Sequence, residues 1–589
     1  MHLVLLETSG NQNYIFSTNK LKENIGASEL TYRAGTKCVL DAVAQIRKQA
    51  SLWSADSEEL RWNLLDLKQN PRLEGNGNTD SKVEIIMATS GKALLLVSEE
   101  EIGKTIIRWA TYAVLKDSPG VDLCGVISKS FEMGESGQLA KAINQVHLQF
   151  EEVKAKRPSM DMRFLRLPIV DECATSGLPA AELVKDIATA ESTLRPYSAI
   201  SMAKRKNHIY GEQRVAAMLR RYDPALKLSE SLTFADAEET QWLAIIHADG
   251  NGLGEIFLKF DEHLLNLIKE KHAIEAEFVS DREYAERLRE FSIALDICTE
   301  KAFVTALKAT FLFKEQTTSL PIAPLVLGGD DLTVVCDAQY ALQFTVDFLK
   351  EFEKETTLAQ VVGGTTITIV PELAKIALGV TRLSSCAGIA IIKPHFPFSV
   401  AYHLAEQLLK TAKTVKTKVT NPENNKPYPC SAIDFHILYD SSGTDLDTIR
   451  KKQQVDNGQT LLYNSPYVVT DINSIPEENG KTWATRHDWN NLCSRAKALN
   501  PDQEGNQELP SKLPNSQVHT LRSYLYMGRE AADGYYQLIK GRYNFTNLED
   551  SEGSLFYEEK DSDVHTTSLL DAMDVMAFLD FDIKTEQQP

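Results

Sequence analysis

The sequence predicts an α+β fold in which a ferredoxin-like unit occurs twice. The order strand, helix, strand, strand, helix, strand can be followed through residues 2–128 and again through residues 242–392. Each copy has a short turn between its two middle strands, at Ser90-Gly91 in the first and within Gly328-Gly329-Asp330-Asp331 in the second. An antiparallel sheet with helices on one face satisfies this order.

The first copy begins with an apolar run that is broken at Glu7. Apolar runs of four to eight residues between turn residues predict strands, and longer segments with apolar residues every three or four positions predict helices. The expected elements are a strand over 2–7, a helical stretch over 20–48, strands over 83–88 and 92–97, a helix over 99–116 and a strand over 122–128.

The second copy has the clearest helix of the chain, because Tyr284 to Phe311 contains neither Gly nor Pro and places apolar residues at helical spacing. A helical crossover of this kind brings the preceding strand beside the following hairpin. The expected elements are a strand over 242–248, a helix over 284–312, a hairpin over 322–336, a helix over 339–355 and a strand over 386–392.

These patterns divide the chain into four predicted domains. They are the first ferredoxin-like unit (1–135), a mostly helical connector (136–240), the second unit (241–440) and a C-terminal helical domain (441–589). The helical pattern is clearest at Leu139–Lys156 in the connector and at Val518–Leu538 in the tail.

Composition restricts the class of protein. The 589 residues include 43% hydrophobic residues, enough for substantial cores, and carry a net charge of −19, which disfavours broad binding to a phosphate backbone. No apolar run has membrane-spanning length, so we expect no membrane contact and a cytoplasmic location. The eight cysteines are scattered singly, without the paired spacing of a zinc site.

Acidic residues follow strands at two places about eighty residues apart. Asp249 lies in Ala248-Asp249-Gly250-Asn251-Gly252-Leu253-Gly254, and Asp330 and Asp331 lie in the hairpin turn of the second copy. Three carboxylates at neighbouring strand ends repel one another unless cations sit between them, and hard oxygen ligands suit Mg²⁺ or Mn²⁺. Two such ions, roughly 4 Å apart, support phosphoryl transfer. A lone Gly-Gly-Asp-Asp would more often be a plain hairpin turn, but the second acidic strand end favours the metal site.

Glycines accompany both acidic positions. Gly250 and Gly252 follow the first strand, and Gly328 and Gly329 precede the two aspartates, so we expect them to leave room for a bound triphosphate. His247 is expected to pack within its strand and not to act as a base, since metal activation of a hydroxyl does not require one. His487-Asp488 is expected to be an ordinary polar pair, because it lacks the additional ligands that a metal site needs.

Several of these motifs together resemble the palm domains of the large polymerase-like subunit of type III CRISPR effector complexes. The resemblance rests on the two acidic motifs, on Ser385-Cys386-Ala387-Gly388-Ile389-Ala390 and on Ser431-Ala432-Ile433-Asp434-Phe435-His436. It also includes Gln12-Asn13-Tyr14-Ile15-Phe16 near the start and Lys410-Thr411-Ala412-Lys413 after the last strand of the second copy. In outline it spans residues 1–440, with the tail more weakly similar.

The resemblance implies synthesis of cyclic oligoadenylate messengers from ATP, switched on when an assembled complex meets target RNA. Asp249 and Asp330 would ligate the metals, Asp331 would complete the cluster or influence the attacking hydroxyl, and Lys413 would meet the triphosphate, unless it is a solvated lysine. Implied partners are ATP and the other effector subunits with guide and target RNA. The family's nuclease domain would precede the first copy, and because this chain starts in a strand we expect no DNase domain.

Other functions stay open at this point. The low number of basic residues, 63 Lys and Arg against 82 Asp and Glu, is also compatible with a synthase that acts outside a ribonucleoprotein. A non-catalytic scaffold that binds nucleotide or RNA is a second interpretation. A cyclase like the GGDEF enzymes that make cyclic di-GMP is a third, although Asp331 stands where those enzymes have glutamate.

Overall fold

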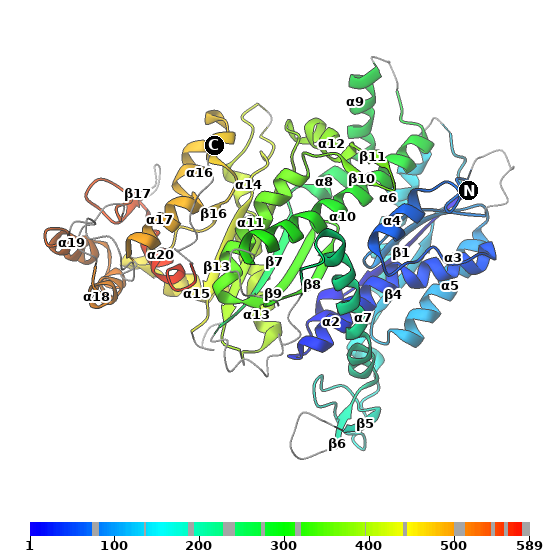
Figure 1. Ribbon diagram of the computed structural model, residues 1–589, viewed down its shortest axis with the longest axis horizontal. Helices are drawn as coiled ribbons and strands as arrows, with labels where there is room; N and C mark the ends of the chain where they lie inside the picture. Colours follow the sequence, from blue (N-terminus) through cyan, green and yellow to red (C-terminus); the bar gives the residue numbers. More distant parts are fainter. Residues whose placement is uncertain are drawn as a thin grey trace.

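The computed structural model shows two sheets with four-stranded antiparallel cores of the same connectivity, joined by helices and followed by a C-terminal region (Figure 1). It describes residues 1–73, 82–134, 137–158, 160–185, 194–227, 242–272, 277–311, 320–394, 396–423, 425–439, 445–499, 513–543, 548–558 and 563–579. The expected domain boundaries at 135, 240 and 440 lie outside these ranges and stay predictions.

The first ferredoxin-like unit has the predicted order of elements. Its sheet is arranged β2-β3-β1-β4, and β1 pairs antiparallel with both β3 and β4. The predicted helical stretch over 20–48 is divided at Thr36 into two helices. The elements are β1 (His2–Ser9), α1 (Asn11–Ile15), α2 (Leu21–Gly35), α3 (Lys37–Arg47), α4 (Ser57–Leu65), β2 (Val83–Thr89), β3 (Lys92–Val97), α5 (Glu100–Asp117) and β4 (Asp122–Ile127).

The second unit repeats this arrangement in the order β12-β7-β9-β8 and extends its sheet by β13 and β16. Its core elements are β7 (Leu243–Gly250), α10 (Asp281–Phe311), β8 (Ile322–Gly328), β9 (Asp331–Asp337), α11 (Ala338–Glu355) and β12 (Ser385–Ile392). The added elements are α8 (Leu253–Leu258), α9 (Phe260–His272), β10 (Gln360–Val362), β11 (Thr365–Ile367), α12 (Ile369–Leu378), α13 (Phe398–Ala412), α14 (Val415–Lys418), β13 (Ala432–Ile437) and β16 (Tyr467–Val468). The predicted α+β class with two ferredoxin-like units is confirmed.

Strand β12 lies at the centre of the second core, since every residue from Ser385 to Ile392 is buried. Such complete burial requires cover on both faces of the sheet. Helix α13 approaches β12 so closely that a Cβ atom at Gly388 would lie 2.0 Å from the carbonyl oxygen of Ala405. Glycine at this position therefore lets α13 pack against the strand, and this fixes where α13 ends.

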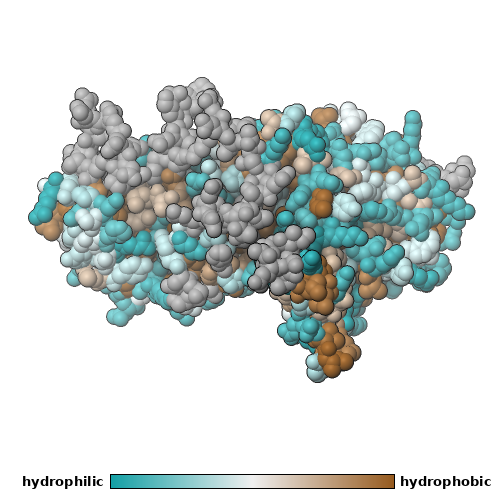
Figure 2. Space-filling view, turned by 60° about the horizontal axis from the view of Figure 1, so that its bottom comes forward, coloured by the Kyte–Doolittle hydropathy of each residue, from teal (hydrophilic) through white to brown (hydrophobic). Residues whose placement is uncertain are grey.

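The connector contains the two long helices α6 (Gln138–Lys156) and α7 (Ala199–Tyr222). Between them lies a hairpin that the sequence analysis did not predict, β5 (Glu182–Lys185) with β6 (Leu194–Tyr197). Figure 2 shows hydrophobic surface on this projecting part of the molecule, where Leu183 is 58% and Leu194 62% exposed. The connector is thus helical over α6 and α7, with a hairpin between them.

The C-terminal region contains the expected helices together with a small sheet. The helices are α15 (Leu446–Lys452), α16 (Lys481–Arg486), α17 (Trp489–Leu499), α18 (Asn515–Leu525), α19 (Arg529–Lys540) and α20 (Leu569–Val575). The sheet has the order β14 (Gln454–Val455), β15 (Thr460–Leu461), β18 (His565–Thr566), β17 (Tyr557–Glu558). Two-residue strands are too short to show an alternating pattern, which is why the sequence did not indicate them. Within the described residues, no helix has both the length and the apolar composition needed to cross a membrane.

Candidate metal centre

The three predicted acidic residues meet at one edge of the second sheet. Asp249 lies near the end of β7, Asp330 in the turn between β8 and β9, and Asp331 at the start of β9. One carboxylate oxygen from each residue lies within 4.8 Å of the others. The antiparallel register explains this, because Ala248 pairs with Leu332 and the next pair is therefore Asp249 and Asp331.

Burial is the main cause of the raised pKa values of two of these carboxyl groups. Burial raises the pKa of Asp330, and burial together with the charge of Asp330 raises the pKa of Asp331 to about 7. Each additional negative charge at this edge is therefore unfavourable unless a cation is near. A set of three carboxylate donors suits Mg²⁺ or Mn²⁺, which prefer hard oxygen ligands.

Lys413 contributes a positive charge to this cluster. The residue follows the last turn of α13, and its Nζ forms an ion pair with Oδ2 of Asp249 and donates to the carbonyl oxygen of Gly250 at 3.3 Å. Burial and the neighbouring Lys416 lower the pKa of Lys413 to about 8, so that it is still mostly protonated at neutral pH. Lys413 is therefore part of the acidic edge and is not a solvated lysine.

The four predicted glycines have two distinct structural roles. A Cβ atom at Gly250 would lie 2.7 Å from Oδ2 of Asp330, so glycine is what lets Asp330 approach β7. A Cβ atom at Gly328 would lie 3.2 Å from Oδ1 of Asp296. Gly252 and Gly329 have φ angles of +77° and +62°, which favour glycine in the turn itself. Contact of these glycines with a nucleotide stays a prediction.

A cavity between the two ferredoxin-like units opens beside the cluster. Asp331 and Gly328 line it from the second unit, and Gln12, Phe16 and Tyr32 line it from the first. Its volume is about 140 Å³. Arg214 of α7 also lines the cavity and forms an ion pair with Glu29 at 2.9 Å. Asp331 of the acidic cluster therefore faces a cavity between the two units.

A second hollow lies at the loop that follows Asp249. Asn251, Ser384, Lys416 and Tyr428 are among its lining residues. The Nδ2 atom of Asn251 donates to Oγ of Ser384 and to the carbonyl oxygen of Cys430, both at 3.1 Å. Its Oδ1 atom is buried and accepts no hydrogen bond from the part of the chain that the structure describes. Sequence reasoning did not single out Asn251, although it stands two residues after Asp249 in the same motif.

Two histidines are buried, and His247 packs within its strand as expected. His247 is buried beside Tyr402, and its Nδ1 lies 2.9 Å from Oγ1 of Thr333. Burial lowers its pKa to about 4, so it is neutral at physiological pH. His487 is buried and stacked on Trp483. Neither side chain belongs to the cluster of three carboxylates.

Two members of the basic clusters Lys204-Arg205-Lys206 and Arg220-Arg221 are held by partners elsewhere in the chain. Lys204 is 1% exposed and donates to Oγ of Ser17 at 2.8 Å. Arg221 forms ion pairs with Asp56 and Glu300. Long basic side chains can bury their charge where carboxylates or carbonyl oxygens are available, and a sequence pattern does not show those partners.

Comparison with known proteins agrees with the resemblance on which the sequence analysis relied. Residues 242–420 match the family model described as Cas10/Cmr2, second palm domain. Over this segment, less than half of its length, the chain is similar to a Cas10/Cmr2 second palm domain. The segment contains all three acidic residues and Lys413. A search of curated proteins gives no match.

Solved structures of low sequence identity are similar over most of the chain. One is a type III-B Cmr-beta complex in the apo state, with 9% identity and a TM-score of 0.49, covering 98% of this chain and 81% of that one. Another is a Csm1–Csm4 cassette in complex with cA4, with 11% identity and a TM-score of 0.45, covering 89% of this chain. The chain thus spans 62% of the length of that cassette's matched chain.

Proposed function

We propose that this protein is a metal-dependent nucleotidyltransferase that makes cyclic oligoadenylate messengers from ATP in type III CRISPR-like antiviral defence. One observation supports this above all: three carboxylates converge within 4.8 Å in a second palm domain, and Asp331 lines the cavity between the two ferredoxin-like units. Acidic residues on paired strand ends beside a cavity are what a two-metal phosphoryl-transfer site requires.

Each residue of the cluster has a proposed role. Asp249, Asp330 and Asp331 hold two divalent cations, Mg²⁺ or Mn²⁺. When bound, such cations stabilise the attacking and leaving oxygens of the displacement. The reaction joins a ribose hydroxyl of one ATP to the α-phosphorus of another and releases pyrophosphate.

Lys413 is proposed to change partners on substrate binding. In this structure its ammonium group neutralises Asp249. Metal ions would take over that neutralisation, which leaves Lys413 available for the negative charge of the triphosphate. The glycines at 250, 252, 328 and 329 keep side chains away from the path along which the phosphates approach.

The direct test is release of pyrophosphate from ATP by the purified protein with Mg²⁺ or Mn²⁺. The matched control carries Asp330→Ala and Asp331→Ala, with folding checked by circular dichroism. Because the family resemblance implies activation by RNA, both proteins are assayed alone and with guide and target RNA and the partner subunits. Equal behaviour of the two proteins under all conditions would contradict catalysis by this cluster.

Mass spectrometry of products formed from all four ribonucleotides then decides the substrate and the linkage. Cyclic oligoadenylates support the proposal, whereas cyclic di-GMP would indicate a GGDEF-like cyclase. A protein that binds partners normally with Asp330 replaced and forms no product in any condition would instead be a palm-domain scaffold. Activity without partner subunits would indicate a synthase that acts alone.

A further inference from the structure

Two side chains of α10 hold the turn that carries Asp330. The backbone N–H of Gly329 donates to Oδ1 of Asp296 at 3.0 Å, and Oγ1 of Thr299 donates to the carbonyl oxygen of Gly329 at 2.5 Å. Asp296 and Thr299 are three residues apart and lie on one face of the helix. Both backbone polar groups of Gly329 are thus bonded to α10, directly before the first aspartate of the pair.

The turn needs this external support because Gly328 and Gly329 have no side chains that could hold it. Glycine is also the residue with the greatest backbone freedom. A Cβ atom at Gly328 would lie 3.2 Å from Oδ1 of Asp296, close enough that Asp296 would have to shift by a few tenths of an ångström. The orientation of the acidic turn therefore depends on where Asp296 is held.

Asp296 is held from the first ferredoxin-like unit. Arg61 of α4 donates to Oδ2 of Asp296 through Nε at 2.9 Å and through Nη2 at 2.5 Å. The same Nη2 donates to Oε2 of Glu300 at 2.7 Å. One oxygen of Asp296 thus faces the acidic turn, and the other faces an arginine that comes from 235 residues earlier in the chain.

Arg61 itself has little freedom to move. Its side chain is 8% exposed, and that of its second partner Glu300 is 5% exposed. Glu300 also accepts from Arg221 and from the hydroxyl of Tyr222, both at 3.0 Å. Charge-assisted hydrogen bonds of this kind are stronger and geometrically more specific than neutral ones.

We propose that Asp296 is a positioning residue for the acidic turn, and that Arg61 fixes it, so that the first ferredoxin-like unit controls the orientation of Asp330 and Asp331. The catalytic consequence of this positioning rests on the proposed nucleotidyl transfer. The positioning itself is a property of the fold and can be measured without turnover.

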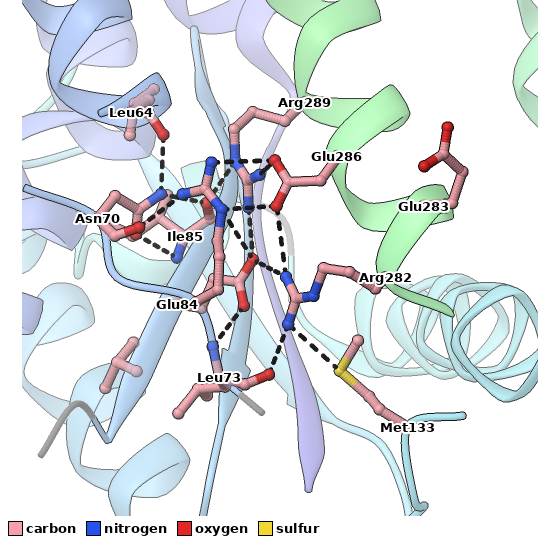
Figure 3. Close-up of polar contacts among 12 residues, drawn as sticks. Leu64, Asn70, Leu73, Glu84, Ile85, Met133, Arg282, Glu283, Glu286 and Arg289 are labelled. Carbon is pink, nitrogen blue, oxygen red and sulfur yellow. Dashed lines mark hydrogen bonds and ion pairs between the residues drawn. The ribbon is translucent and has the colours of Figure 1, made fainter. Parts of the chain in front are cut away.

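Helix α10 offers a matched control on the same interface. In its first three turns, Arg282 and Arg289 both donate to Glu84 of β2, at 2.7 and 2.6 Å (Figure 3). Arg72 of the first unit pairs with Glu286 of α10. This second network also joins the first unit to α10, but it does not contact Gly329. Arg282→Gln therefore weakens the interface without removing a support of the turn.

The test is hydrogen–deuterium exchange, read by mass spectrometry on a peptide that spans the turn. In the wild type the amide of Gly329 is expected to be protected, and in Asp296→Ala to exchange about 10-fold faster, because opening no longer breaks a hydrogen bond. Arg61→Gln should accelerate exchange of this amide less than Asp296→Ala does. Arg282→Gln should leave the exchange rate at the turn unchanged. Equal exchange in the wild type and in Asp296→Ala would overturn the proposal, and so would equal acceleration by Arg282→Gln.

Asp296→Asn keeps the side-chain volume and an acceptor for Gly329 but loses the charge that binds Arg61. In this variant the amide of Gly329 should exchange at a rate between those of the wild type and Asp296→Ala. The asparagine variant also keeps the test decisive if the alanine variant does not fold. Where turnover is found, Asp296→Ala is expected to lower kcat by about 100-fold with little change in the KM for ATP, as displaced catalytic groups do. Lack of turnover in the wild type would count against the proposed reaction only, since the exchange experiment still decides the positioning.

Discussion

The two ferredoxin-like units share one topology and differ at one strand edge. In the first unit the hairpin reads Thr89-Ser90-Gly91-Lys92, and Lys92 lies opposite Glu7 and forms an ion pair with it at 3.2 Å. In the second unit the corresponding pair is Asp331 and Asp249, by continuation of the register between β7 and β9. The first unit thus has a cation and an anion where the second has two anions.

This difference shows how the same fold serves two purposes. The first unit neutralises its strand edge internally, so that edge has no need of an ion from outside. The second unit gathers three carboxylates and receives positive charge from Lys413, a residue outside its hairpin. Functional sites often keep such locally unfavourable arrangements, and the rest of the fold compensates for their cost.

The largest expected effect comes from removing the acidic charge of the second unit. Asp330→Asn with Asp331→Asn should lower pyrophosphate release by about 1,000-fold or more, because the cations lose two of three ligands. With the corresponding change in the first unit, Glu7→Gln with Lys92→Met, pyrophosphate release should stay within about two-fold of the wild-type rate. The assay is the ATP turnover described above, and a comparable loss in both doubly substituted proteins would contradict the comparison.

A substitution that makes the second edge resemble the first is expected to remove metal binding. In Asp331→Lys the new ammonium group can pair with Asp249 as Lys92 pairs with Glu7. Binding of Mn²⁺, followed by electron paramagnetic resonance, should weaken about 100-fold, since a ligand is lost and a positive charge is added. The metal-free protein should melt at a higher temperature than the wild type. Unchanged Mn²⁺ binding would show that the ion is held elsewhere.

Replacement of Lys413 should have a smaller effect that is confined to substrate binding. Lys413→Met is expected to raise the KM for ATP by about 10-fold through loss of a charge-assisted contact with the triphosphate. Lys410→Met is the control on the same helix, because Lys410 is 67% exposed and pairs with Glu406. Equal KM values for the two variants would show that Lys413 only neutralises Asp249.

The smallest effect concerns the pH dependence of stability in the metal-free protein. The pKa of Asp331 is raised from 3.8 to about 7, so the folded state keeps a proton that the unfolded state releases. Stability should therefore fall as pH rises from about 4 to about 7. Asp331→Asn removes this contribution, and its melting temperature in EDTA should exceed that of the wild type by more at pH 8 than at pH 5. A difference that does not vary with pH would argue against the raised pKa.

The sequence by itself determined the order of the main strands and helices in the two ferredoxin-like units and the residues of the acidic cluster. Strand and helix patterns are local, so the expected hairpin over 322–336 and the helix over 284–312 appear as β8 with β9 and as α10. The meeting of Asp249 with Asp330 and Asp331 followed from one general rule, that a helical crossover returns the chain beside its own strand.

Only the tertiary structure decided which residues support that cluster. Arg61 and Asp296 are 235 positions apart, and nothing near either residue indicates the other. The partners of Lys204 and Arg221, the closeness of Asp330 to Gly250 and the cavity between the units were likewise not evident from the sequence. Periodicity in the sequence shows which face of a helix or strand is buried. Contacts between the two units depend instead on how whole faces pack together, and this packing exists only once the complete chain has folded.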